Sequence, residues 1–241
     1  MSRSSNTTQP DSGVEAAVSA FAAGGPVLIH DATDREGEVD LVYPAASVTP
    51  ADVARMRNDA GGLICVALPE SVCETWKLPF AQELLDHPAG ADHRLGYDAR
   101  SSFSITVNHR DTFTGITDED RALTISELGA AAGRIAREQQ VAGDGAADAI
   151  ATDAESFAES FRAPGHVHLL RGASDLLGDR EGHTELGLAL AEAAGVEPAV
   201  VVCEMLADET GGALSPAAAR AYADRNGFPY VEGSELIARF Q

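Results

Sequence analysis

Carboxylates are concentrated in the stretch 31–40, which reads Asp-Ala-Thr-Asp-Arg-Glu-Gly-Glu-Val-Asp and is flanked on each side by a short apolar run. If the flanking runs are strands, the acidic stretch is the loop that joins their ends. Alternation in an extended segment places Glu36, Glu38 and Asp40 on one side. Three such carboxylates repel one another unless a cation or a proton joins them, and oxygen-rich sites suit Mg²⁺ or Mn²⁺. The stretch predicts a metal site, with an exposed acidic turn as the alternative.

A second stretch whose residues could take part in chemistry is 178–185, which reads Gly-Asp-Arg-Glu-Gly-His-Thr-Glu and precedes an apolar helical pattern. Gly182 lets the backbone approach a ligand closely, and the start of the following helix offers unpaired N–H groups to a phosphate. Arg180 supplies a charged fork, Thr184 a hydroxyl, and His183 a nitrogen that could ligate a metal. The stretch therefore predicts an anion site, the alternative being a helix cap with a surface arginine.

Two further residues are candidates for proton transfer. His166 lies where a turn feeds a strand, so it could shuttle protons or simply be hydrogen-bonded in the structure, and His168 shares its face as a weak His-x-His metal pair. Glu204 ends the apolar run 200–203, where a carboxylate is costly to bury unless it is paired or protonated. Glu204 therefore suits general acid–base work, or it emerges into water at the strand end. Cys65 lies in an apolar strand and is by default a small buried hydrophobe.

Composition indicates a globular protein whose acidic surface repels large anionic partners. The chain has 241 residues, 44% of them hydrophobic, which is enough for a sizeable core. Asp and Glu total 38 against 17 Lys plus Arg, a net charge of −21. Such a surface repels nucleic acid and anionic membranes, so we expect neither as a partner. Lys77 is the single lysine, and an acidic, lysine-poor surface resembles haloarchaeal proteins adapted to saturating intracellular salt.

No apolar run approaches the roughly 18–20 residues that span a bilayer. The first 13 residues are polar, so we expect a disordered N-terminal tail over 1–13, no signal peptide and a cytoplasmic location. Three cysteines without a C-x-x-C pair favour reduced thiols over a disulfide frame or a zinc site. Neither a dinucleotide-binding glycine motif nor a P-loop motif is present.

The elements that must position these residues follow from periodicity and from turn residues. The pattern predicts strands over 26–30, 40–44, 63–68, 102–108, 166–170, 199–206 and 229–231. Helices are predicted over 14–23, 50–57, 71–76, 124–140, 155–161, 183–194, 216–226 and 234–240. The helix at 124 is expected from a capping box of Thr124 with Glu127. Long loops are expected over 79–100 and 142–154. We therefore expect one α/β (or α+β) domain over 14–241, with a mixed sheet sandwiched by helices and its most apolar strand, 199–206, at the centre.

Four motifs occur together in a fixed order: Asp-Arg-Glu-Gly-Glu-Val-Asp-Leu at 34–41, Pro-Gly-His-Val at 164–167, Gly-His-Thr-Glu at 182–185 and Cys-Glu at 203–204. Together they resemble 3,4-dihydroxy-2-butanone 4-phosphate (DHBP) synthase, an enzyme family of riboflavin biosynthesis. Thr-Gly-Ile at 114–116, followed by Asp120 and Arg121, is also similar to that family. The resemblance covers the chain from about Gly24 to Phe240.

The resemblance implies a DHBP synthase-like fold and a homodimer with active sites near the subunit interface. It implies a lyase that converts D-ribulose 5-phosphate to L-3,4-dihydroxy-2-butanone 4-phosphate and formate, using Mg²⁺ (or Mn²⁺). By motif position, the metal ligands would be Glu36 and His183, and the residues essential for catalysis would be His166 and Glu204. The substrate-binding residues would be Arg35, Glu36, Asp40, Arg180, Glu181, Gly182, His183, Thr184 and Glu204. Asp31, Glu38 and Cys65 match positions near the site, and no fused cyclohydrolase domain, found in some relatives, is expected.

Two other functions are compatible with the same residues. One is a different metal-dependent sugar-phosphate enzyme, such as an aldolase or an isomerase, which would not release formate. The other is a non-catalytic module that binds metal through its acidic loops, for which His166 would be dispensable.

Overall fold

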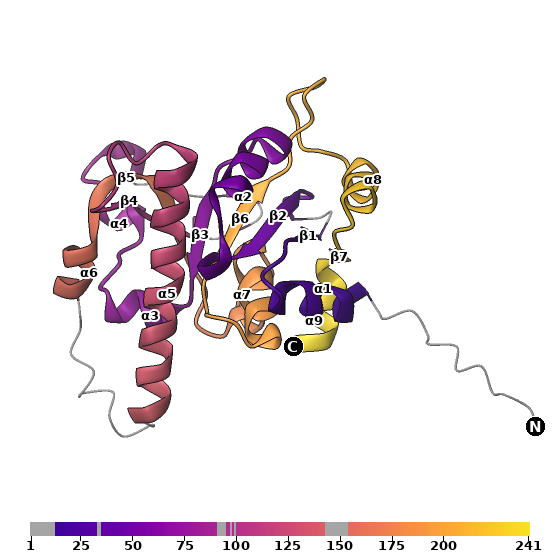
Figure 1. The fold of residues 1–241 in the computed structure, drawn as a ribbon. Coiled ribbons are helices and arrows are strands. Elements are labelled where there is room, and N and C mark those ends of the chain that lie inside the picture. Colours follow the sequence, from indigo (N-terminus) through magenta and orange to yellow (C-terminus); the bar gives the residue numbers. More distant parts are fainter. Residues whose placement is uncertain (1–12, 33–34, 91–94, 97, 99, 143–153) are drawn as a thin grey trace, which may run out of the picture.

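The computed structural model describes residues 13–32, 35–90, 95, 96, 98, 100–142 and 154–241. The expected tail over 1–13 therefore lies outside the described residues, except for its last position, and so does most of the loop expected over 142–154. Seven strands form one mixed sheet in the order β4-β5-β3-β6-β2-β1-β7 (Figure 1). The strands are β1 (Val27–His30), β2 (Val39–Pro44), β3 (Cys65–Leu68), β4 (Phe103–His109), β5 (Phe161–Arg171), β6 (Val200–Glu204) and β7 (Tyr230–Glu232).

The pairing of the strands confirms a mixed sheet. Strands β1 and β2 form an antiparallel hairpin, and β2, β6 and β3 continue antiparallel. The parallel neighbours are β3 with β5 and β1 with β7. As expected for the most apolar run, β6 lies at the centre of the sheet, and its residues 200–203 are fully or almost fully buried.

Helices cover both faces of this sheet, as predicted (Figure 1). The helices are α1 (Gly13–Ala22), α2 (Pro50–Arg55), α3 (Glu70–Thr75), α4 (Ala81–Leu84), α5 (Asp118–Ala142), α6 (Ala154–Ser160), α7 (His183–Ala194), α8 (Pro216–Asn226) and α9 (Gly233–Phe240). Helix α7 is apolar on nearly all sides because it packs against the sheet and between α1 and α9. Helices α2 and α5 pack together over the opposite core.

Strand alternation decides which side chains reach the α7 face. Val42 of β2 and Val202 of β6 belong to the core beneath α7, whereas Leu41 and Cys203 belong to the core on the other face. Counting by twos from Val42 and Val202 brings Asp40 and Glu204 to the α7 face at the strand ends.

One predicted helix start was wrong. Helix α5 begins at Asp118 rather than at Thr124, which is a fully buried residue inside the helix. The hydroxyl that caps this helix belongs to Thr117, whose Oγ1 accepts the N–H of Asp120 at 3.1 Å. The Thr124 hydroxyl instead accepts the N–H of His109, at 2.9 Å, and so ties the helix to the end of β4. A capping pattern read from sequence cannot tell these two uses of a threonine apart.

Other elements depart from the expected bounds in smaller ways. The expected loop over 79–100 contains α4 and a short 3₁₀ turn at Pro88–Gly90, and residues 91–94, 97 and 99 lie outside the described residues. Strand β5 begins at Phe161, the last residue of the helix predicted over 155–161. Helix α2, which begins at Pro50 after Thr49, continues into a π turn, Met56–Ala60, that ends at Gly61 with a φ of 84°. In the described part of the chain, no helix is both long enough and apolar enough to cross a membrane.

We predict that Gly165→Ala destabilises the fold where β5 meets β4. A Cβ at Gly165 would lie 1.9 Å from the carbonyl carbon of Val107, which is backbone and cannot rotate away. We expect the free energy of unfolding to fall by about 1–3 kcal/mol, measured by urea denaturation. Gly212→Ala is the matched control, since its nearest contact is an ordinary 3.6 Å to Thr210 Oγ1. Equal stability of the two variants would mean that the strands separate easily at this point.

Candidate active site

The acidic loop between β1 and β2 is folded around its own first carboxylate. Asp31 is buried, and its two carboxylate oxygens accept the N–H groups of Glu36 at 3.2 Å and Glu38 at 3.0 Å. The guanidinium of Arg35 lies 3.7 Å from the same carboxylate. Because Asp31 holds the backbone, the side chains of Glu36 and Glu38 are directed into one cavity on the α7 face of the sheet.

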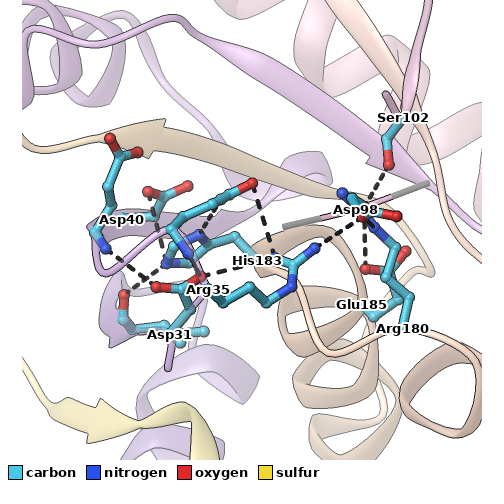
Figure 2. Close-up of polar contacts among 11 residues, drawn as sticks. Asp31, Arg35, Asp40, Asp98, Ser102, Arg180, His183 and Glu185 are labelled. Atoms are coloured by element: carbon cyan, nitrogen blue, oxygen red, sulfur yellow. Dashed lines mark hydrogen bonds and ion pairs between the residues drawn. The ribbon is translucent and has the colours of Figure 1, made fainter. Parts of the chain in front are cut away.

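His183, the first residue of α7, lies at the centre of the carboxylates. Its Nε2 is 3.2 Å from the carbonyl oxygen of Ile29 and 3.7 Å from Asp40 Oδ1, and its Nδ1 is 3.5 Å from Glu36 Oε2 (Figure 2). A carbonyl oxygen can only accept, so Nε2 carries a proton and donates it to Ile29. Nδ1 is thereby left facing Glu36, either protonated or available to a cation.

Burial and charge act in opposite directions on this group of side chains. Burial alone would lower the pKa of His183, but the carboxylates of Asp40, Glu36 and Asp31 outweigh it and raise the pKa to about 9. Burial raises the pKa of Asp40 to about 7, against the attraction of His183. The hydrogen bond from His183 lowers the pKa of Glu36 in spite of its burial. An imidazolium at His183 therefore balances the buried negative charge when no metal is bound.

The same residues fit a divalent metal ion. Asp31, Glu36 and His183 each offer a ligand atom, and these atoms lie within 4.8 Å of one another. Asp40 Oδ1 is buried and has no hydrogen-bond partner among the described residues, so it adds an unsatisfied acceptor beside the cluster. Carboxylate oxygens with one imidazole suit Mg²⁺ or Mn²⁺. The structure thus brings together the two predicted ligands, Glu36 and His183, and adds Asp31.

The cavity beside this cluster has a volume of about 280 Å³. Its walls include seven of the predicted site residues: Arg35, Glu36, Asp40, Arg180, His183, Thr184 and Glu204. Glu38 and Cys65 also line it, and burial keeps the pKa of the Cys65 thiol well above its usual value, so this cysteine is neutral. Gly182 is not part of the wall but leaves room for the guanidinium of Arg35, since a Cβ there would lie 2.6 Å from its Nη1. Glu181 is exposed and lies outside the walls of this cavity.

At the strand ends the cavity carries two further carboxylates. Glu204 of β6 lies directly opposite Asp40 of β2 in the sheet, and its Oε2 accepts the N–H of Leu63 at 2.8 Å. A Cβ at Gly62 would lie 2.5 Å from that same oxygen, so only glycine lets the carboxylate sit there. Burial, and then the charge of Glu204, raise the pKa of Glu38. Glu38 and Glu204 are therefore neighbouring carboxylates in different environments, as acid–base pairs require.

Two arginines of the cavity wall, Arg35 and Arg180, converge on one carboxylate. Arg35 Nη2 lies 3.0 Å from Asp98 Oδ2, and the Nε of Arg180 donates to the same oxygen (Figure 2). Arg180 Nη1 also donates to the hydroxyl of Ser102 and, at 3.3 Å, to the buried carboxylate of Glu185. Sequence reasoning missed these three partners of Arg180. Glu185 was visible in the Gly-His-Thr-Glu motif, whereas Asp98 lies in a stretch without periodicity.

His166 is not among the described residues that line the cavity of its own chain. Its backbone N–H donates to Asn108 Oδ1 at 2.8 Å, and its ring Nδ1 lies 3.2 Å from the same side chain. The Asn108 amide also donates to the carbonyl oxygen of Thr114 at 3.4 Å, which places the turn at 113–116 beside His166. Neither His166 nor His168 belongs to the candidate metal-binding cluster of Asp31, Glu36 and His183. Burial lowers the pKa of His168, which makes it a neutral side chain near neutral pH.

Comparison with known proteins identifies the family. The family model for 3,4-dihydroxy-2-butanone 4-phosphate synthase matches residues 15–239 of the chain. The chain belongs to the 3,4-dihydroxy-2-butanone 4-phosphate synthase family. Synthases of this name from Archaeoglobus fulgidus and Methanosarcina mazei are 45% and 44% identical to it, each over 94% of this chain and over 93% and 90% of their own lengths. The chain is therefore an enzyme of riboflavin biosynthesis, as the four motifs predicted.

The fold comparison agrees with the family. A crystal structure of a 3,4-dihydroxy-2-butanone 4-phosphate synthase in complex with two magnesium ions matches with a TM-score of 0.74 and 28% identity. The match covers 94% of this chain and 95% of that one. The expected DHBP synthase-like fold is thus confirmed, and a relative with this fold binds magnesium.

We predict that Mg²⁺ binding to the metal-free protein releases about one proton at pH 7.5. Below about pH 9 the imidazole of His183 is protonated, and it must lose that proton to ligate a metal. Affinity should consequently fall about tenfold for each pH unit below that value. Calorimetric titration in two buffers of different ionisation enthalpy measures the released protons. His183→Asn should bind Mg²⁺ more weakly, and wild-type binding without proton release would contradict His183 as a ligand.

Proposed function

We propose that this protein converts D-ribulose 5-phosphate to L-3,4-dihydroxy-2-butanone 4-phosphate and formate. The observation that carries the proposal is one cavity at which a divalent-metal donor set and an arginine pair lie side by side. The carboxylates of Glu38 and Glu204 line the same cavity. This arrangement suits a small phosphorylated sugar whose carbonyl end meets the metal side. Membership of the synthase family supports the same reaction.

Arg35 and Arg180 would bind the substrate phosphate. Arg35 and Arg180 provide two guanidinium groups, each buried over most of its surface, where they interact more strongly with an anion than they would in water. The start of α7 adds backbone N–H groups and the positive end of the helix dipole, and Thr184 adds a hydroxyl. These local positive groups would hold an anionic substrate against the net charge of −21.

Proton transfers in the cavity fall to the carboxylates. Glu38 has a raised pKa and so can hold a proton closer to neutral pH than an ordinary glutamate can. Glu204, anchored by the N–H of Leu63, lies next to it and can accept or return a proton. Asp31, Glu36 and His183 would hold the cation, which when bound polarises substrate carbonyl and hydroxyl oxygens. Mg²⁺ is the expected ion and Mn²⁺ the alternative.

A homodimer would give His166 a catalytic role. His166 does not line its own chain's cavity, and the turn next to it exposes Phe113 and Ile116, with 93% and 50% of their surfaces accessible. That turn is held in shape because Asp120 accepts the N–H groups of Phe113, Thr114 and Gly115. In an isologous dimer each face meets its own copy, so two equivalent His166 residues can reach the two cavities. We infer that each cavity is completed by the partner's His166.

Formate release from ribulose 5-phosphate tests the reaction. With Mg²⁺ in molar KCl we expect formate in step with substrate loss, and no formate after EDTA treatment. His166→Ala and Glu204→Ala should each lower kcat by about 10²–10⁴-fold, because each removes a proton-transfer group. An aldolase or an isomerase would consume substrate without formate, and a binding module would leave it intact. Asp86→Asn, an exposed carboxylate outside the cavity walls, is the control for charge loss.

Mixing inactive variants tests the shared site. If His166 acts in the partner's cavity, a dimer of one His166→Ala chain and one Glu204→Ala chain holds one intact cavity. Random exchange makes half of the dimers mixed, so about a quarter of wild-type activity should return. No recovery despite subunit exchange, verified by mass spectrometry, would place His166 in its own chain's site or outside catalysis.

A further inference from the structure

Asp98 lies between the two arginines that would bind phosphate. A single oxygen, Oδ2, takes hydrogen bonds from Arg35 Nη2 at 3.0 Å and from the Nε of Arg180 (Figure 2). Only 14% of the Asp98 side-chain surface is accessible, so this is a largely enclosed contact. Two guanidinium groups that donate to one anionic oxygen reproduce the way arginines hold a phosphate oxygen.

We infer that Asp98 is an internal competitor for the substrate phosphate, which occupies the arginine pair until a phosphate displaces it. This inference rests on the proposed function only in taking Arg35 and Arg180 as the phosphate site. Asp98 makes the site specific, because an anion must bind the arginines better than a tethered carboxylate does in order to enter. A dianionic phosphate with three free oxygens meets that condition, whereas a monovalent ion such as chloride does not.

The second carboxylate on Arg180 explains why Asp98 is the one that leaves. Glu185 is fully buried in the first turn of α7, and its Oε1 accepts the N–H of Ala173 at 3.1 Å while its Oε2 holds Arg180. Releasing Glu185 would expose a buried charge and break a backbone contact. Asp98, by contrast, lies outside any helix or strand, between the 3₁₀ turn at Pro88–Gly90 and β4.

The atoms used on Arg180 separate the permanent contacts from the replaceable one. Nη1 donates to Ser102 and Glu185, and Nε donates to Asp98. A phosphate can therefore take the place of Asp98 while Ser102 and Glu185 keep the guanidinium oriented. The apparent dissociation constant for phosphate is then the intrinsic one divided by the fraction of molecules in which the arginines are not held by Asp98.

Calorimetric titration of the full chain with inorganic phosphate tests this inference, in EDTA and at constant ionic strength. Asp98→Asn removes the competing charge and keeps the size, and we expect the dissociation constant to fall about tenfold, the size of one charge-assisted hydrogen bond. Asp98→Ser removes the charge in a different way and should tighten binding similarly. Asp86→Asn removes an equal charge from the same segment, where it is exposed, and should change the constant by less than about twofold.

Each outcome decides the inference. Unchanged or weaker phosphate binding in both Asp98 variants, with melting curves that show folded protein, would mean that Asp98 only orients the arginines. Equal tightening by Asp86→Asn would assign the effect to net charge, and absence of phosphate binding in wild type and in both Asp98 variants would remove the site. The phosphate titration does not depend on turnover. Tighter phosphate binding by the Asp98 variants, together with no formate in the separate turnover assay, would therefore uphold the role of Asp98 while refuting the proposed reaction.

Discussion

The site depends on how a protein can keep several carboxylates close together out of water. A buried carboxylate is stable only if it is paired, protonated or bound to a metal. Here the answer is His183, which faces Asp40 and Glu36 at once and whose pKa the surrounding charges raise to about 9. The same arrangement that tolerates a proton on His183 suits a divalent cation, because both neutralise the same oxygens. The loop, the first turn of α7 and the end of β2 are all held in register by this charge balance.

The rest of the fold can be understood as the support for that balance. The antiparallel register of β2 and β6 places Asp40 opposite Glu204, and α7 lies on the sheet so that its first turn meets the hairpin loop. Gly182 allows the Arg35 guanidinium to come close to the helix start. Metal, substrate phosphate and proton-transfer groups would thus be fixed relative to one another by rigid elements.

The arginines show how a chain with a net charge of −21 can still bind an anion. Arg35 and Arg180 are largely buried and are oriented by carboxylates, so their local field is stronger than the screened charge of the surface. The acidic surface has little effect inside the cavity, because the field of the surface charges falls off within a Debye length in salt. The overall charge of the protein and the charge preference of its site are therefore set independently.

Much of the site could be predicted because its residues are neighbours in short motifs. The acidic stretch and the Gly-His-Thr-Glu helix start each carry several groups at fixed spacing, and the structure brings Glu36 and His183 to 3.5 Å of each other. One residue that escaped prediction, Asp98, lies in a stretch without periodicity, whereas Glu185 lies in a motif that did not reveal its pairing with Arg180. The start of α5 was wrong for a related reason, since Thr117 and Thr124 both look like caps until the fold assigns one hydroxyl to a helix end and the other to His109.

By itself, the sequence determined the family, the mixed α/β class, the central position of β6 and the residue types of the candidate metal and phosphate sites. These properties follow from local patterns, namely the alternation of apolar residues and the spacing within motifs. Only the tertiary structure decided that Asp31 folds the acidic loop, that Glu185 and Asp98 share Arg180, and that His166 is not in the wall of its own chain's cavity. These contacts join residues that sheet register and helix packing bring together. No single stretch of sequence encodes the distance between such residues.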